Sequence, residues 1–257
     1  MPRRTRSFAV SAGFSLAVAL PAWLASTPAE ARCQDGPKPR VDWSGCSKAQ
    51  LLLSNQDLSG AVFAKALLTN GDFSRARLPG AKLNEAEVSR ARFEGADLSG
   101  SDFAKAVGWR ANFTGANLAR ASFSGADMSR ALFNGAAIAG AAFSKSEMNR
   151  ADFSGADLSG VDFSKAELAR AVFSGAKLSG ANLSFANLSR AQLGGLDLSG
   201  ANLTGAYLYL SQLGGADLSR ATGLTQAQLD SACGSGDTKL PAGLAAPKAW
   251  PCPREDD

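Results

Sequence analysis

Large apolar residues recur along this chain every five residues, which fits neither the two-residue period of a half-buried strand nor the 3.6-residue period of a helix. When residues 41–220 are written in frames of five, starting at Val41, the third place holds a large apolar side chain in 34 of 36 frames. The exceptions are Lys48 and Gly108. The first place is mostly Ala, and the second, fourth and fifth places are mostly polar or Gly. This period predicts a solenoid in which every frame forms one short side.

A second period, of twenty residues, indicates that each coil contains four frames. The fifth-place Arg residues with this spacing are Arg90, Arg110, Arg130, Arg150, Arg170 and Arg190. Fifth-place Gly residues recur at the same spacing, offset by ten, from Gly60 to Gly200. The sequence therefore predicts a square cross-section, about nine coils stacked ~4.8 Å apart, and right-handed winding.

These frames resemble the pentapeptide-repeat family, whose motif is Ala, then Asp or Asn, then Leu, then two variable residues. Residues 96–100 (ADLSG), 156–160 (ADLSG) and 201–205 (ANLTG) match this motif. The resemblance implies an all-β solenoid, a right-handed quadrilateral β-helix whose first and third places point inward. Some cytoplasmic members of the family resemble duplex DNA and bind type II topoisomerases, so the resemblance also implies a DNA-mimicking role as an alternative function.

The Phe residues predict how the interior is packed. Eleven of the 14 Phe residues stand at third places between Phe63 and Phe173, where they alternate with Leu, Met or Ile. With four frames per coil, they form columns on two opposite sides. One column is predicted to contain Phe103, Phe123, Phe143 and Phe163, and the other Phe93, Phe113, Phe133, Phe153 and Phe173. We interpret both columns as packing, because large rings fill a narrow interior well.

Both ends of a solenoid expose unpaired backbone and need caps. We expect an N-terminal cap at residues 32–52, the β-helix at 53–222, and a C-terminal cap at 223–257 that contains a short helix over residues 225–232 with Thr225 as N-cap. Four Cys residues allow three pairings. A bridge needs Cα atoms within ~7 Å, so the length of the stack leaves Cys33–Cys46 and Cys233–Cys252.

The first 31 residues have the features of a secretory signal peptide: basic residues from Arg3 to Arg6, an apolar run from Phe8 to Leu20, and an A-x-A pattern ending at Ala31. We expect cleavage after Ala31, a periplasmic or secreted protein, and no membrane span in the mature chain. An uncleaved membrane anchor is the alternative. Export also agrees with disulfide formation.

The composition excludes several kinds of active site. The chain has no His, which excludes His-based triads and His metal ligands, and it contains no phosphate-binding glycine loop or metal-ligand cluster. We expect no enzymatic activity, no cofactor and no metal. Without residues 1–31 there remain 24 basic and 22 acidic residues, a balance that indicates neither specific nucleic-acid binding nor the strongly acidic surface of a DNA mimic. The sequence favours an exported, non-catalytic scaffold that binds an unknown protein or an anionic polymer.

Outward residues supply two candidate surfaces. The first is the set of six Arg residues given above, with Lys65, Lys105, Lys145 and Lys165 on the neighbouring edge. These cations could form a stripe that binds a polyanion. We favour the alternative, a solvated edge whose charges pair with Glu87, Asp127, Glu147 and Glu167. The second comprises Phe185, Tyr207, Tyr209 and Leu210. We favour a tail after Gly234 that covers them, over a contact with a partner or with a second copy in a homodimer. Gly108 and Trp109 predict a bulge in one side.

Overall fold

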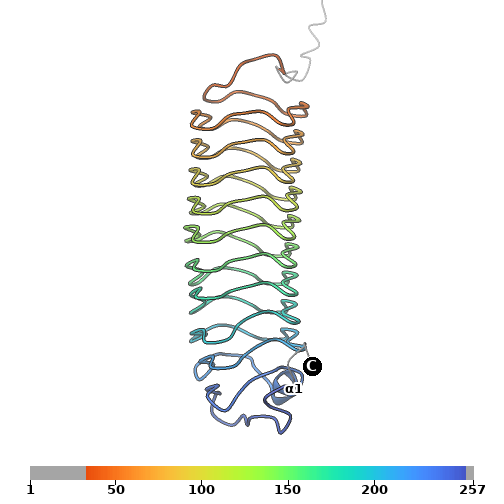
Figure 1. The fold of residues 1–257 in the computed structure, drawn as a ribbon, viewed down its shortest axis with the longest axis vertical. Coiled ribbons are helices and arrows are strands. Elements are labelled where there is room, and N and C mark those ends of the chain that lie inside the picture. Colours follow the sequence, from red (N-terminus) through yellow and green to blue (C-terminus); the bar gives the residue numbers. More distant parts are fainter. Residues whose placement is uncertain (1–32, 253–257) are drawn as a thin grey trace, which may run out of the picture. The chain divides into compact units, whose positions relative to one another are not determined.

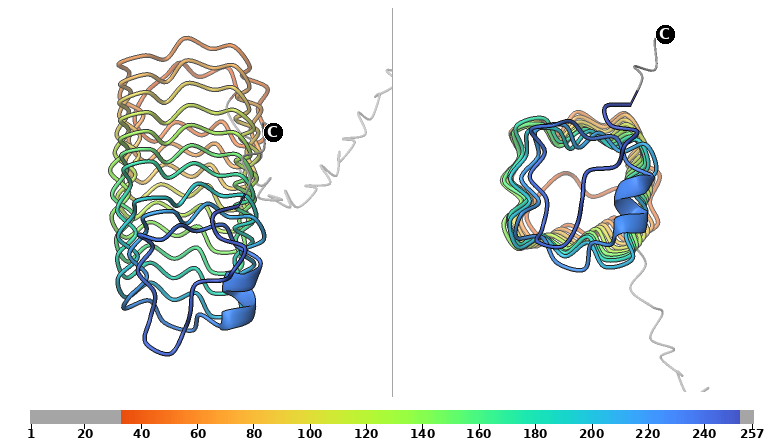
Figure 2. Two further views of the ribbon diagram at one scale, coloured as in Figure 1. Left: turned by 60° about the horizontal axis from the view of Figure 1, so that its bottom comes forward. Right: turned by 90° about the horizontal axis from the view of Figure 1, so that it is seen from below.

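A computed structural model describes residues 33–252; the predicted signal peptide lies outside these residues. The described residues belong to one compact unit, in which the backbone winds into stacked coils (Figure 1). Seen along the stack, the coils superpose on a square outline (Figure 2). The structure is the right-handed quadrilateral β-helix that the two periods and the family resemblance predict.

Successive coils are joined by parallel bridges between second places that are twenty residues apart, from Asp42 with Val62 to Asn202 with Thr222. In the frame of residues 71–75, the amide of Asp72 donates to the preceding coil at 2.8 Å, and those of Phe73 and Arg75 donate to the following coil at 2.7 and 2.8 Å. The first amide closes the turn behind it at 3.1 Å. Each coil is therefore held by backbone hydrogen bonds to both neighbours, as buried backbone requires.

The second-place side chain satisfies the remaining amide of many frames. The Ser99 amide donates to Asp97 Oδ1 at 3.1 Å, and the Ser184 amide donates to Asn182 Oδ1 at 3.2 Å. Asp and Asn are short enough to accept from a backbone amide two residues on, which explains their frequency at this place. At Asp217, hydrogen bonds from the Ser219 hydroxyl, Lys239 and the Ser219 amide lower the pKa of the carboxyl from 3.8 to about 2.

The fifth place of each frame forms a corner of the square. The third-place carbonyl accepts from the first amide of the next frame, as between Phe63 and Ala66 at 2.9 Å. The fifth residue between them has a φ of 54° to 72° in every frame from Arg40 to Gly215. Positive φ at this point of a four-residue turn is what type II turns require. Gly adopts it without steric cost, which explains the fifth-place Gly residues.

The interior is filled by the first and third places, whose side chains are almost completely buried. Within each of the two predicted Phe columns the rings are stacked, with centroids 4.8 to 5.3 Å apart from coil to coil. Between the columns the rings meet edge to face, as for Phe133 and Phe143 at 5.8 Å and 89°. Both are favourable aromatic arrangements, and the predicted columns are confirmed.

Ser101 stands at a first place, where Ala is usual, and its hydroxyl is buried with no hydrogen-bond partner. Replacing Ser101 with Ala should raise the free energy of unfolding by about 1 kcal/mol, because it removes a desolvated and unpaired hydroxyl. The matched control is Ser146→Ala, since Ser146 is equally buried but its Oγ donates to the Phe143 carbonyl at 2.6 Å. Urea unfolding of the two variants checks the difference; a Ser101→Ala variant no more stable than Ser146→Ala would contradict it.

The N-terminal end is closed by the Cys33–Cys46 disulfide, with Cα atoms 5.5 Å apart. Trp43 fills the first interior position, donating from Nε1 to the Asp35 carbonyl at 3.1 Å and packing on Phe63 at 5.6 Å. Lys48, one of the two exceptions to the apolar third place, lies with Nζ 4.5 Å from the centre of the Trp43 ring. The cation therefore packs on the ring that begins the core, at the N-terminal end of the described residues.

The C-terminal cap begins with α1 (Gln226–Asp230), the predicted short helix, which has Thr225 as its N-cap. The Gln228 side chain accepts from the Thr225 amide and donates to two carbonyls of the coil beneath, at 2.8 and 2.9 Å. The helix ends two residues earlier than predicted, because Cys233 leaves it to pair with Gln212. Among residues 33–252, no helix is long and apolar enough to cross a membrane.

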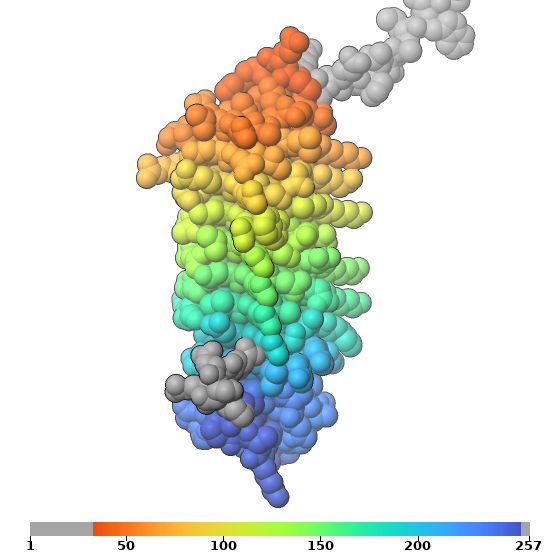
Figure 3. Space-filling model, turned by 45° about the vertical axis from the view of Figure 1, so that its right-hand side comes forward, coloured from red at the N-terminus to blue at the C-terminus, as the bar shows by residue number. Residues whose placement is uncertain are grey.

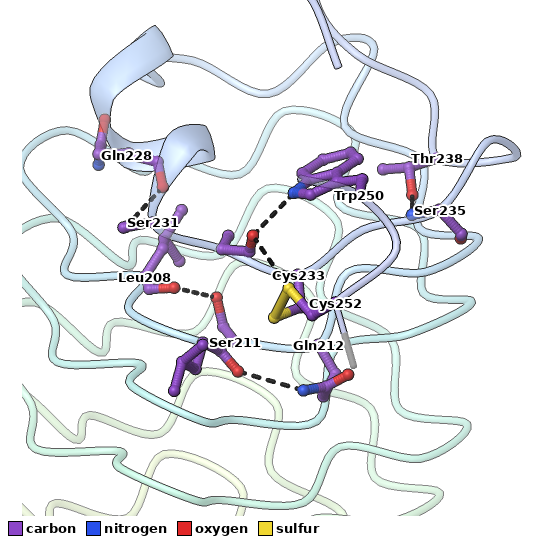
Figure 4. The surroundings of a disulfide bond; sticks show 12 residues. Leu208, Ser211, Gln212, Gln228, Ser231, Cys233, Ser235, Thr238, Trp250 and Cys252 are labelled. Atoms are coloured by element: carbon purple, nitrogen blue, oxygen red, sulfur yellow. Dashed lines mark hydrogen bonds between the residues drawn. A yellow bond between two sulfur atoms is a disulfide. The ribbon is translucent and has the colours of Figure 1, made fainter. Parts of the chain in front are cut away.

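The rest of the cap crosses the open end of the stack. The Cys233–Cys252 disulfide has Cα atoms 5.3 Å apart. It ties the tail to Cys233, which follows α1 and forms a bridge with Gln212 of the last coils. Trp250 donates from Nε1 to the Ala232 carbonyl at 2.7 Å (Figure 4), and its ring occupies the space that a side chain at Gly234 would need. Both predicted disulfides are confirmed, and each one closes an end of the stack.

Candidate binding face

One of the four faces of the stack carries most of the unusual outward residues. We define the basic face as residues 46–50 and the equivalent residues of each later coil, up to 206–210, together with the corners on both sides. The corner that follows it carries the Arg ladder, defined as Arg90, Arg110, Arg130, Arg150, Arg170 and Arg190. The corner before it carries Lys65, Lys105, Lys145 and Lys165. Long side chains project from the stack coil after coil (Figure 3).

Charge is segregated on to this face. The basic face carries the ten cationic side chains just named, Lys48 at its N-terminal end, and five anionic side chains, Glu85, Glu87, Asp127, Glu147 and Glu167, a net charge of +6. The remainder of residues 33–252 carries eleven cationic and fourteen anionic side chains, a net charge of −3. A nearly neutral chain thus presents one positive surface, which attracts anions.

The Arg ladder occupies strained backbone. Its six residues have φ between 55° and 60°, a conformation that costs a non-glycine residue roughly 1 kcal/mol or more. Gly stands at the equivalent corner of most coils on two other corners, without that cost. Strain retained over six consecutive coils indicates that the guanidinium groups contribute something other than stability.

The expected pairing of the Arg ladder with Glu87, Asp127, Glu147 and Glu167 is wrong. Within residues 33–252, no carboxylate lies within 4 Å of the guanidinium of Arg90, Arg110, Arg130, Arg150 or Arg170. Glu87 and Asp127 instead accept from the backbone amides two residues on, at 3.1 and 3.0 Å, and Glu167 accepts from Asn187 Nδ2 at 2.7 Å.

The direction of the corner side chains explains why the pairs do not form. At other corners, the next coil has a Gly at the equivalent position. The Cγ atoms of Arg75, Lys105 and Arg120 lie 3.6 to 3.7 Å from the point that a Cβ would occupy on that Gly. Corner side chains therefore lean along the stack toward the following coil, not across the face toward the second place of their own frame. The stems of neighbouring Arg residues can pack on one another, leaving their charged ends in solvent.

Trp109 lies within the Arg ladder, a role that the sequence did not reveal. The Cζ atoms of Arg110, Arg90 and Arg130 are 4.3, 5.2 and 6.0 Å from the ring centre, so three guanidinium groups surround one indole. Cation–π contacts of this kind hold Arg side chains in place without neutralising them. The available signal was a large aromatic residue at a fourth place, beside a fifth-place Arg.

The predicted bulge at Gly108 and Trp109 is also wrong. The Gly108 amide donates to the next coil at 2.7 Å, and Val107 forms bridges to both neighbouring coils, so the register is unbroken. A Cβ at Gly108 would lie 2.3 Å from Met128 Sδ. The flexible Met side chain fills the missing volume, and no backbone adjustment is needed.

The aromatic patch, defined as Phe185, Tyr207, Tyr209 and Leu210, lies at the C-terminal end of the same face. Phe185, Tyr207 and Tyr209 are 60%, 55% and 46% exposed, and the two Tyr rings are nearly parallel, with centroids 6.1 Å apart. The expectation that the tail covers this patch is wrong for the described part of the tail. Its residues cross the end of the stack instead, where unpaired backbone needs partners.

Among residues 33–252, little suggests catalysis. A surface cavity of about 490 Å³ lies on the neighbouring face, lined in part by Ser74, Arg75 and Arg92. Arg92 is held there by Asp72 at 3.7 Å and Glu94 at 2.9 Å, an arrangement that ties the charges together. In the part of the chain that the structure describes, no group of three or more acidic or Cys residues is placed to hold a metal ion.

Comparisons with known proteins agree with this architecture. The family model described as pentapeptide repeats matches eight copies, over residues 52–84, 80–107, 111–150, 146–184 and 186–222. A comparison with curated proteins finds no match.

Among solved structures, the chain is similar to HetL, a pentapeptide repeat protein involved in heterocyst differentiation regulation from the cyanobacterium Nostoc sp. strain PCC 7120, at 28% identity over 71% of this chain and 91% of that one, with a TM-score of 0.38. A pentapeptide repeat protein from the Arabidopsis thaliana thylakoid lumen is 29% identical over 49% of this chain and 80% of that one, with a TM-score of 0.34. Full-length QnrB1, a plasmid-mediated fluoroquinolone resistance protein, is 18% identical over 74% and 94%, with a TM-score of 0.42. Scores this low transfer no function.

Proposed function

Because the chain belongs to the pentapeptide-repeat family, we propose that it is an exported, non-catalytic scaffold that binds an extended anionic partner along its basic face. The observation that carries this proposal is the line of guanidinium groups from Arg90 to Arg170, which have no carboxylate partner among the described residues. A line of cations at one-coil intervals offers charge-assisted hydrogen bonds to a ligand that runs along the stack.

Two further observations support the scaffold and its export. The interior is filled completely by stacked side chains, so a partner can bind only on the outer faces. Two disulfides close the ends, and disulfides persist in oxidising compartments outside the cytoplasm. Together with the signal features of residues 1–31, they favour action in the periplasm or outside the cell.

The charge distribution disfavours the alternative of a DNA-mimicking, topoisomerase-binding protein. Such mimicry needs a strongly acidic surface, whereas residues 33–252 carry 22 cationic and 19 anionic side chains, and one face is distinctly positive. A DNA-binding partner is itself positive and would be repelled from that face.

The test is a fourfold variant in which Arg110, Arg130, Arg150 and Arg170 are replaced with Gln. The free energy of unfolding should change by no more than about 1 kcal/mol, because exposed charges contribute little to stability. Wild-type protein should bind heparin or an acidic polysaccharide at low salt. This binding should weaken as added salt shortens the Debye length below ~10 Å. The fourfold variant should lose the binding. Calorimetric titration at two salt concentrations measures both effects.

The matched control replaces four cations on other parts of the surface, Arg77, Lys82, Arg120 and Lys177, with Gln. It changes the net charge by the same amount and should retain most of the binding. Equal loss in both variants would mean that only total charge matters. Failure of the wild-type protein to bind any polyanion at low salt would exclude the proposed function.

A further inference from the structure

We propose that the anionic partner is a linear polysaccharide of uronic acid units, bound with its chain parallel to the stack. This rests on the proposed function, that the basic face binds an extended anion, and adds the chemical class of the ligand. Three features of the face support it: the spacing of the Arg ladder, a parallel line of carboxylates, and the aromatic patch in line with both.

The spacing of the coils sets the spacing of the Arg ladder. Equivalent interior rings repeat every 4.8 to 5.3 Å. An extended peptide presents side chains on one side every ~6.8 Å, and one strand of duplex DNA adds a phosphate every ~3.4 Å along its axis, so neither stays in register over six coils. A pyranose unit linked through opposite ring carbons spans close to one coil, so a uronic acid chain can present carboxylates at one-coil or two-coil intervals.

A line of carboxylates lies beside the Arg ladder on the same face. We call Glu87, Asp127, Glu147 and Glu167 the acidic column. Each occupies a second place, three residues before the Arg of the ladder in the same frame. An acidic helix has a pitch of ~5.4 Å and would follow the coils well, but this column would repel it, as it would repel a nucleic acid strand. A uronic acid unit carries hydroxyl groups beside its carboxylate. The ladder can donate to the carboxylates while the acidic column accepts from the hydroxyls.

The aromatic patch continues the same columns beyond the last Arg. Tyr207 follows Asn187 in the second-place column, and Leu210 follows Arg190 at the corner. Exposed aromatic rings pack against the apolar C–H face of a pyranose, and a Tyr hydroxyl supplies a polar contact at the edge of the same surface. The patch therefore suits sugar rings that extend past the charged part of the face.

The test uses the full chain, a defined oligogalacturonate, the same oligomer with its hydroxyls acetylated, an oligo-dT strand and polyglutamate, titrated at one ionic strength. We expect the oligogalacturonate to bind best and its acetylated form to bind weakly despite its unchanged charge. The decisive variant is Glu147→Gln, because the carboxylate of Glu147 has no hydrogen bond or ion pair within the described residues that the substitution would remove. It should weaken binding by about threefold to tenfold, although it makes the face more positive.

The control variant is Asp157→Asn, at the second place of the opposite face, which should leave binding unchanged. If the face merely attracts polyanions, Glu147→Gln will strengthen binding, and oligo-dT or polyglutamate will bind as tightly as the oligogalacturonate. That result would overturn the polysaccharide inference and leave the proposed function intact. If none of the four probes binds, both are wrong.

Discussion

Replacing Phe133 with Ala should lower the free energy of unfolding by about 3–5 kcal/mol, the range expected for a fully buried ring. Phe133 is completely buried, is stacked on Phe113 and Phe153 at 5.0 and 4.9 Å, and meets Phe143 edge to face. The coils cannot close over the cavity, because backbone hydrogen bonds above and below fix their separation. The loss should therefore lie at the upper end of that range.

Urea unfolding measures this loss against two other variants. Ala136→Leu should also destabilise, by about 1–3 kcal/mol, because the first place has no room for a larger side chain; Ala136 is 3% exposed. Ser124→Ala, at an outward fourth place, should change stability by no more than about 0.5 kcal/mol. Similar losses in all three variants would contradict the division into inward and outward places.

The sequence predicted the backbone of this protein well because each frame repeats the same physical constraints. The small first place, the large third place and the turn at the fifth place determine the shape of each side of the coil. The twenty-residue spacing of Arg indicates that each coil has four such sides. The disulfide pairs followed from the length of the stack. Such agreement between local and global requirements is typical of a sequence that specifies one structure.

The surface was predicted less well, because the repeat does not determine in which direction a side chain leans. Four carboxylates three residues before an Arg suggested ion pairs, yet the corner side chains lean along the stack. Of these carboxylates, Glu87 and Asp127 accept from the backbone and Glu167 accepts from the next coil. The tail was expected to cover Tyr207 and Tyr209. The tail covers the end of the stack instead, because leaving a buried backbone amide without a hydrogen bond costs more free energy than exposing an aromatic ring.

Gly108 and Trp109 illustrate a different limit. In sequence they are two consecutive departures from the pattern, which suggested one local distortion. In the structure they are separate adaptations: Gly108 makes room inward for Met128, and Trp109 points outward among three Arg residues. Only the neighbouring coils, twenty residues away in either direction, distinguish the two roles.

Removing the C-terminal disulfide, by Cys233→Ala with Cys252→Ala, should have the second largest effect. The bridge closes a loop of 19 residues, and its loss should lower the free energy of unfolding by about 3 kcal/mol in the chain-entropy model. The tail that it holds donates to and accepts from the last coil; the Leu213 amide, for example, donates to the Cys233 carbonyl. Thermal unfolding of the oxidised protein and the variant measures the loss.

The same variant should also associate with itself, which distinguishes a cap from a simple cross-link. When the tail detaches, the coil at Leu213 and Leu218 loses acceptors for its amides, and an uncovered edge of this kind pairs with other chains. Size-exclusion chromatography with light scattering, over a range of protein concentrations, should reveal concentration-dependent oligomers. The unmodified protein under the same conditions is the control. A variant that loses stability but stays in the oligomeric state of the control would mean that the tail covers the end without the disulfide, and that the bridge acts only on the unfolded chain.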